Sequence, residues 1–332
     1  MMTDYVATTP GLYPLPDWAK DDLSELKGHQ KEDLLTGEEG EDIEAAYEQA
    51  RGEVLDDQLT AELDRVVEGQ LRWDDQLAHP LTIHDAVETG GIVRYYDNNN
   101  FYRDPQVVGE LDFSGDMAAE LEQAVAHVGD ESQVQATLPG PYSLAQLATD
   151  QYYDDEAEFL QAITEFLVGE LTAFPDHDTV YLLEPSLVTD PPGDGEDAQV
   201  SEAIDTVAGA TDADVIVQTY WDTLEEKMYA HLMDADIDAV GFDFIAGDRE
   251  QALYNINEYG TKDSIALGVV DGQNTLVEDA ETVTERVSWI DERVPNEEFE
   301  SVYVTSNTEL FYLPVNKYKR KLTALADAVE AL

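Results

Sequence analysis

Carboxylate and amide side chains stand directly after several short apolar runs of this sequence. Such groups donate and accept hydrogen bonds, and a carboxylate can also accept a proton. In a barrel of parallel strands, the residues that follow each strand lie at one common face, where they can build a binding site. The candidates that meet this description are Glu184, Asp243, Asp271, Gln273, Asn274 and Asn307.

Two of these candidates have a structural reading beside the functional one. Asp243 lies between Phe242 and Phe244, so its carboxylate must face a barrel mouth or find a partner inside the fold. It is therefore either a ligand-binding group or a helix cap or member of a buried ion pair. Glu184 precedes Pro185 and has the same two readings. Asp271, Gln273 and Asn274 surround Gly272, which permits a tight turn there, and we assign them to a binding rim.

A second group of candidates lies in the first third of the chain. Arg72, beside Trp73, can clamp a carboxylate through two parallel hydrogen bonds. Because the chain has only 17 lysines and arginines, a local ion pair explains Arg72 equally well. Asn98, Asn100 and Tyr102 can line the same mouth, although an asparagine run is also ordinary turn chemistry. The six histidines lack the spacing of a metal motif, and we expect structural or solvated roles for them.

Eight runs with strand character must position these residues. Helical patterns with apolar residues three and four apart separate most of them, and eight such units close a barrel. We therefore predict an α/β fold, a (β/α)8 TIM barrel formed by residues 1–332 as one domain, with an acidic helical insertion at 17–64. A doubly wound sheet is the alternative, but no GxGxxG turn supports it. The runs are Tyr5–Thr8, Val66–Trp73 with its polar exit, Gln133–Thr137, Val180–Leu183, Val215–Gln218, Ala239–Phe242, Ile265–Val269 and Val302–Thr305.

The charge of the chain excludes several classes of protein. With 74 acidic and 17 basic residues the formal charge is −57, so no basic surface for nucleic acid is expected beyond the cluster Lys317–Lys321. The acids are spread along the whole chain, a pattern typical of a halophilic protein. No apolar run is long enough for a membrane span, and no signal pattern begins the chain, so we expect a cytoplasmic protein. The absence of cysteine excludes disulfides and thiolate ligands.

The ordered motifs resemble the cobalamin-independent methionine synthase family, whose members move a methyl group from a folate to homocysteine. The resemblance runs from about Val66 to the C-terminus and fits the zinc-free, N-terminal barrel of the two-barrel enzymes. It implies a methyltransferase component of methionine biosynthesis, with a methyl-folate and possibly homocysteine as substrates. The segments that carry it are Tyr95–Tyr102, Leu138–Pro141, Leu183–Pro185, Phe242–Phe244, Leu267–Asn274 and Leu313–Leu322.

The departures from the family pattern concern the metal. The family's catalytic barrel binds zinc through a His-x-Cys pair, a glutamate and a late cysteine, and Gln218, Tyr220, Asp243 and Asn307 stand at the corresponding positions here. Such a set is a poor zinc site. The resemblance therefore implies no metal or other cofactor on this chain, and a zinc-bearing methionine synthase chain as its partner.

Two other functions remain open at this point. One is a non-catalytic structural or regulatory barrel that docks on the zinc-bearing methyltransferase. The other is an unrelated barrel enzyme, such as a decarboxylase of the porphyrin type, which would need more arginines at its mouth than this sequence offers.

Overall fold

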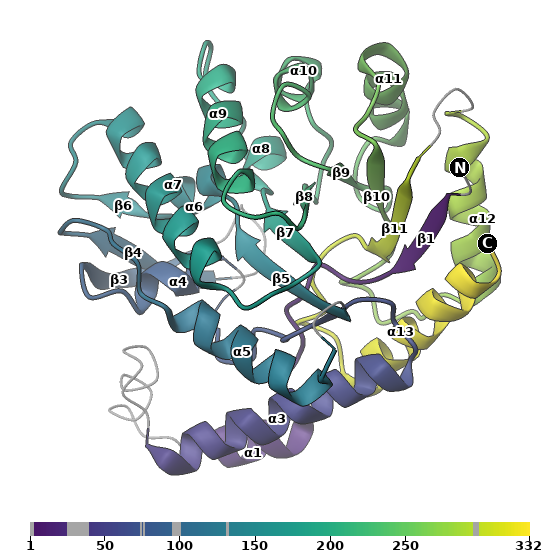
Figure 1. Ribbon diagram of the computed structural model, residues 1–332, viewed down its shortest axis with the longest axis horizontal. Coiled ribbons are helices and arrows are strands. Elements are labelled where there is room, and N and C mark those ends of the chain that lie inside the picture. Colours follow the sequence, from purple (N-terminus) through teal and green to yellow (C-terminus); the bar gives the residue numbers. More distant parts are fainter. Residues whose placement is uncertain are drawn as a thin grey trace.

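The computed structural model describes residues 3–24, 40–73, 75, 77–94, 101–130, 133–294 and 299–332. Eight parallel strands form one curled sheet in the order β1-β11-β10-β9-β8-β7-β5-β2, with helices on its outer side (Figure 1). The prediction of an α/β barrel with parallel strands is confirmed. The strands are β1 (Asp4–Ala7), β2 (Val66–Val67), β5 (Val134–Pro139), β7 (Thr179–Leu183), β8 (Asp214–Gln218), β9 (Ala239–Asp243), β10 (Ser264–Val270) and β11 (Ser301–Ser306).

The strands form where β-branched and other apolar residues follow one another without interruption. Every residue of β7 and β10 is buried, as expected for strands covered on both faces. β2 is shorter than the predicted run Val66–Trp73 because Gly69 and Gln70 have φ angles of 106° and 50°, which extended backbone does not adopt. The chain therefore leaves the barrel directly after Val67.

Among the described residues, no ladder of backbone hydrogen bonds joins β1 to β2. Other contacts close the gap between these two strands. The Ala7 carbonyl accepts hydrogen bonds from the backbone N–H groups of Asp64 (3.0 Å) and Arg65 (3.3 Å). The buried Gln58 side chain donates to the Val67 carbonyl (2.8 Å) and accepts from the Val67 N–H (2.9 Å), so it takes the place of a neighbouring strand. These contacts satisfy backbone groups that would otherwise be buried without partners.

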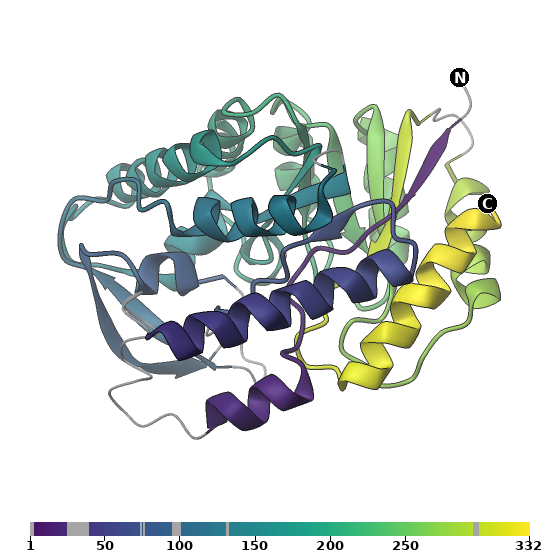
Figure 2. The same cartoon turned by 60° about the horizontal axis from the view of Figure 1, so that its bottom comes forward.

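Helices cover the outer face of the sheet. Figure 2 shows α3 between α5 and α13, with α1 beside it. The predicted insertion at 17–64 thus contains α1 and α3, and α3 packs on the barrel with Tyr47, Val54 and Leu55 buried. That the whole chain is one domain stays a prediction. The helices are α1 (Asp17–Ser24), α3 (Glu41–Thr60), α4 (His79–Thr82), α5 (Asp116–Val128), α6 (Pro141–Leu147), α7 (Glu156–Ala173), α8 (Ser186–Thr189), α9 (Asp197–Ala208), α10 (Glu226–Leu232), α11 (Arg249–Tyr259), α12 (Ala280–Asp291) and α13 (Val315–Glu330).

A second, three-stranded sheet projects beside the barrel (Figure 1). Its strands are β3 (Val87–Arg94), β4 (Phe101–Val107) and β6 (Thr149–Asp150). All three lie in connections that follow barrel strands β2 and β5, and such connections belong to the C-terminal face of a barrel. No helix of the described residues is long and apolar enough to cross a membrane.

Candidate functional site

Asp243 ends β9 and is 3% exposed, with both carboxylate oxygens occupied by hydrogen bonds. One oxygen accepts the N–H groups of Ile245 and Ala246, each at 2.8 Å, and so fixes the turn after the strand. The other accepts the Trp221 N–H at 2.9 Å and the Asn307 side-chain amide at 3.0 Å. Four donors compensate for the burial of this charge.

Asn307 follows β11 and joins Asp243 to the next loop. Its side-chain nitrogen donates to Asp243, and its side-chain oxygen accepts the Gly272 N–H at 2.9 Å. The close packing requires glycine nearby, since a Cβ at Gly272 would lie 2.6 Å from the Glu309 carbonyl oxygen. The pair, which we call the Asp243–Asn307 hub, therefore ties together the loops that follow β8, β9, β10 and β11.

Asp271, Gln273 and Asn274 form the turn that the hub supports. The Asp271 carboxylate accepts the N–H groups of Gln273 and Asn274, each at 3.0 Å, while the side chains of Gln273 and Asn274 are exposed. The predicted rim residues thus lie directly beside Gly272 and the hub. The Asn274 side-chain oxygen accepts the Leu276 N–H at 3.0 Å, and the exposed side chains of Gln273 and Asn274 remain within reach of a ligand.

A buried ion cluster anchors the far end of the same loop. The Lys321 ammonium, 1% exposed, donates to a Glu278 carboxylate oxygen at 2.5 Å and to the Leu276 carbonyl at 2.7 Å. Arg286 lies 3.3 Å from the other Glu278 oxygen, which also accepts the Asp271 N–H. Burial opposes ionisation of Glu278, but the hydrogen bonds from Lys321 and the Asp271 backbone outweigh it and lower its pKa. This part of the C-terminal cationic cluster is therefore internal.

Glu184, at the end of β7, is completely buried and caps helix α6. Its two oxygens accept the N–H groups of Tyr142 (3.0 Å) and Ser143 (2.7 Å), and it lies so close to Gly140 that a Cβ there would be 2.2 Å away. Burial raises the pKa of Glu184 to about 7, and the hydrogen bonds from Ser143 and Tyr142 offset part of that effect. The position of Glu184 fits a structural role. Because its pKa is about 7, the Glu184 carboxyl changes its protonation state around neutral pH.

The candidates of the first third of the chain have different surroundings. The Arg72 guanidinium lies 3.0 Å from Asp116 and 3.1 Å from Glu120 of α5, so it forms a local ion pair. Tyr102 is 8% exposed, and burial together with the charges of Asp104 and Asp75 raises its pKa to about 12. Asn98 and Asn100 lie outside the described residues.

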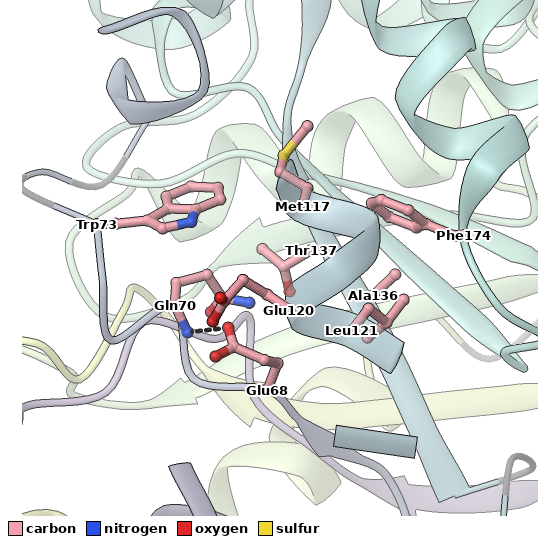
Figure 3. A pocket seen from close by; sticks show the side chains of 9 residues that line it. All are labelled: Glu68, Gln70, Trp73, Met117, Glu120, Leu121, Ala136, Thr137 and Phe174. Carbon is pink, nitrogen blue, oxygen red and sulfur yellow. Dashed lines mark hydrogen bonds between the residues drawn. The ribbon is translucent and has the colours of Figure 1, made fainter. Parts of the chain in front are cut away.

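A small cavity beside β2 reveals residues that the sequence analysis did not select (Figure 3). Its volume of about 20 Å³ suffices for one water molecule. A Glu68 oxygen accepts the Gln70 N–H at 2.6 Å, and the Arg51 guanidinium lies 2.8 Å from the other. The sequence feature that could have identified Glu68 and Gln70 is the polar segment Glu-Gly-Gln, which directly follows the apolar pair Val66–Val67. The cavity is lined by Glu68, Gln70, Trp73, Met117, Glu120, Leu121, Ala136, Thr137 and Phe174.

The rim residues do not fit zinc. Gln218, Tyr220, Asp243 and Asn307 include neither a thiolate nor an imidazole, and the oxygens of the one carboxylate are engaged by the four N–H donors of the hub. In the part of the chain that the structure describes, no group of three or more His, Asp or Glu side chains could hold a metal ion.

The fold and the polar rim define an α/β-barrel protein whose C-terminal mouth, in the residues that the structure describes, carries hydrogen-bonding side chains. The chain belongs to the cobalamin-independent synthase family, because residues 38–295 match the sequence model of its N-terminal domain.

Curated relatives and solved structures agree with this assignment. A methionine synthase of Saccharolobus solfataricus is 22% identical over 98% of this chain and 94% of its own length. A 5-methyltetrahydropteroyltriglutamate–homocysteine methyltransferase of Salinibacter ruber is 28% identical, over 70% of this chain but 30% of the longer relative. The structure of a B12-independent methionine synthase from Shewanella superposes with a TM-score of 0.79 at 17% identity, covering 98% of this chain and 96% of that one.

Proposed function

We propose that this chain is the methyl-donor barrel of a cobalamin-independent methionine synthase. It binds a 5-methyltetrahydrofolate-type donor at its C-terminal mouth, while a separate zinc-bearing chain holds homocysteine. The match to the family's N-terminal domain supports the assignment. The name of the Salinibacter ruber relative supports the choice of methyl donor and acceptor.

The observation that carries this proposal is the match of residues 38–295 to the family's N-terminal domain, and the Asp243–Asn307 hub bears only on where homocysteine is activated. Homocysteine attacks as a thiolate, which a metal ion stabilises by direct coordination. At this rim Asp243 and Asn307 bond to each other, at 3.0 Å, and to backbone N–H groups. This engagement of Asp243 and Asn307 supports the proposal that another polypeptide activates the thiol.

The reaction then divides between the two chains. The thiolate sulfur attacks the methyl carbon, the carbon–nitrogen bond of the donor breaks, and its electron pair remains on the ring nitrogen, which takes up a proton. This chain binds and orients the donor through the exposed groups of Gln273 and Asn274 and the partly exposed Asp271. Correct orientation of two reactants supplies a large share of the rate in a transfer of this kind.

Calorimetry with 5-methyltetrahydrofolate in high salt tests the proposal. We expect binding by the wild-type chain and weaker binding, by roughly five- to a hundredfold, after Asn274→Ala, because one hydrogen bond to the ligand is lost. Asn257→Ala, at an exposed position of α11, is the matched control and should bind as the wild type does. Methionine should form only when a zinc-containing homocysteine methyltransferase barrel of the same organism is added. If the wild type binds no donor, alone or with that barrel, the proposal is wrong.

The second candidate is a structural or regulatory subunit that docks on the zinc-bearing chain. The saturation of Asp243 by four hydrogen bonds favours it, because a carboxylate so engaged serves the fold. The two functions differ in one measurement: the docking subunit raises the activity of the zinc-bearing barrel without binding the methyl donor.

A further inference from the structure

His84 joins the two ends of the hairpin that β3 and β4 form. It lies in the chain that leads from α4 into β3, and its side chain is 2% exposed. The His84 carbonyl accepts the Val87 N–H at 2.9 Å, and the Ala86 carbonyl accepts the Val108 N–H at 3.0 Å. Asp112, which follows β4, contacts the His84 ring. The residue therefore stands at the base of the second sheet, which projects beside the barrel (Figure 1).

The two ring nitrogens of His84 have opposite roles. Nδ1 lies 3.0 Å from the Ala86 nitrogen and accepts its N–H. Nε2 lies 2.8 Å from the Asp112 carbonyl oxygen, which can only accept, so Nε2 carries the proton of the neutral ring. The Asp112 nitrogen is farther from Nε2, at 3.4 Å, and its contact is the weaker of the two. The neutral imidazole thus accepts from the start of β3 and donates to the segment after β4.

A second proton on this ring would break one of the two contacts. It would bind to Nδ1 and turn the acceptor of the Ala86 N–H into a donor, so that two N–H groups would face each other. The contact with Asp112 would remain, because its carboxylate oxygen lies 3.3 Å from Nε2 and attracts an imidazolium. Phe166 of α7 packs edge to face against the ring, with centroids 5.6 Å apart, and holds it in this orientation.

The charged groups on the elements around this ring are carboxylates. Asp112 is 87% exposed, and Asp85, the residue that follows the histidine, is also exposed. On α7 the completely buried Glu170 accepts the N–H groups of Ser114 (2.7 Å) and Gly115 (3.0 Å) with one oxygen. Glu170 therefore fastens the segment after β4 to α7 by contacts of its own. The start of β3 is the part of the hairpin that depends on the protonation of the ring.

We propose that His84 is a pH-sensitive latch of the second sheet. The neutral ring holds the start of β3 against the segment after β4, and protonation of Nδ1 releases it. This inference goes beyond the methyl-donor function and does not depend on it. An imidazole gains its proton within the range of about pH 8 to pH 5, and protonation of histidine switches the order of other proteins in the same way. Because the sheet lies in connections of the C-terminal face, the latch makes the order of that face depend on pH.

Amide hydrogen exchange of the wild-type chain in high salt, measured by mass spectrometry at about pH 7.5 and about pH 5.5, tests the latch. Each rate is normalised to the intrinsic exchange rate at its pH. The protection of residues 87–94 should fall at the lower pH by about fivefold or more, the effect of losing one hydrogen bond of ordinary strength. The protection of β10, which pairs with β9 and β11 in the barrel sheet, should not fall.

Two substitutions separate the proton from the packing of the ring. His84→Asn keeps an acceptor near the position of Nδ1 but cannot be protonated, so the protection of residues 87–94 should be the same at both pH values. Asp112→Asn removes a carboxylate that attracts the proton, so the loss of protection should move to lower pH. His127→Asn is the matched control: His127 lies on α5 and pairs with Asp56 at 3.0 Å, and its loss should leave the pH dependence of the sheet unchanged.

Nitrogen-15 NMR of the histidine-labelled wild type tests the latch without any substitution. At about pH 8 the His84 ring, assigned through its contact with Phe166, should carry its proton on Nε2. A proton on Nδ1 instead would overturn the inference, because Nδ1 could then not accept the Ala86 N–H. The inference is also wrong if residues 87–94 of the wild type keep their protection at the lower pH, or if His84→Asn loses it in parallel with the wild type.

Discussion

Replacing Asn307 with alanine should destabilise the protein by about 3 kcal/mol. The substitution removes a hydrogen bond to the charged Asp243 carboxylate, worth about 1.5–3 kcal/mol, and one to the Gly272 N–H, worth about 1 kcal/mol. Asn307 is 3% exposed, and water does not readily replace either partner. For a chain of 332 residues the loss corresponds to a fall of roughly 4 °C in melting temperature.

Urea unfolding in high salt measures this change, because guanidinium chloride would itself alter the screening of a chain with a charge of −57. Asn257→Ala serves as control: the Asn257 amide, exposed on α11, donates to the Leu253 and Arg293 carbonyls, and because water can replace these bonds the loss should be no more than about 1 kcal/mol. Asn307→Asp is the more informative variant, since it places a second carboxylate against Asp243. It should be less stable than Asn307→Ala at pH 8 and recover below about pH 5, where the two carboxylates can share a proton.

Two results would refute this reasoning. If Asn307→Ala unfolds like the Asn257→Ala control, the hub does not hold the four loops together. If the stability of Asn307→Asp relative to Asn307→Ala does not depend on pH, the Asp243 carboxylate is not close enough to position 307 to interact with it.

Three further predictions concern charge. The folded pKa of Glu184, raised from 4.5 to about 7, favours the folded state at low pH by roughly 3 kcal/mol, and this contribution disappears as pH rises through 7. The wild type should therefore lose stability relative to Glu184→Gln between about pH 4.5 and pH 7 in urea unfolding, with a plateau above that range; parallel pH curves would contradict this. Lys321→Met leaves the buried Glu278 without its closest cation and should cost about 3 kcal/mol, with faster proteolysis of residues 271–279, whereas Lys317→Met should have little effect. Finally, the charge of −57 should make the fold depend on salt, because the screening length grows from about 3 Å at 1 M to about 10 Å at 0.1 M. A circular dichroism spectrum that remains native after transfer to dilute buffer would show that repulsion between the acidic side chains does not control the stability of the fold.

The sequence alone determined the strands of the barrel and the face on which its polar residues gather. The predicted run Ile265–Val269 lies within β10 (Ser264–Val270), and the other predicted runs from residue 133 onward also match their strands to within one or two residues. This is possible because strand character depends on the residues within each run and on the turn residues that bound it. The order of strands around a barrel then follows from chain order, since consecutive parallel strands are neighbours.

What each polar residue does at the end of its strand was decided only by the tertiary structure. Asp243 had two readings in the sequence, and its partners Trp221 and Asn307 come from strands 22 and 64 residues away. Glu184 accepts hydrogen bonds at the N-terminus of α6, and Arg72 pairs with acidic residues of α5. No local sequence pattern predicts either contact. A side chain's hydrogen-bond partners and burial depend on which distant segments reach the same point in space. The positive φ angle of Trp221, 80°, has the same origin, because its backbone N–H donates to Asp243 at the end of another strand.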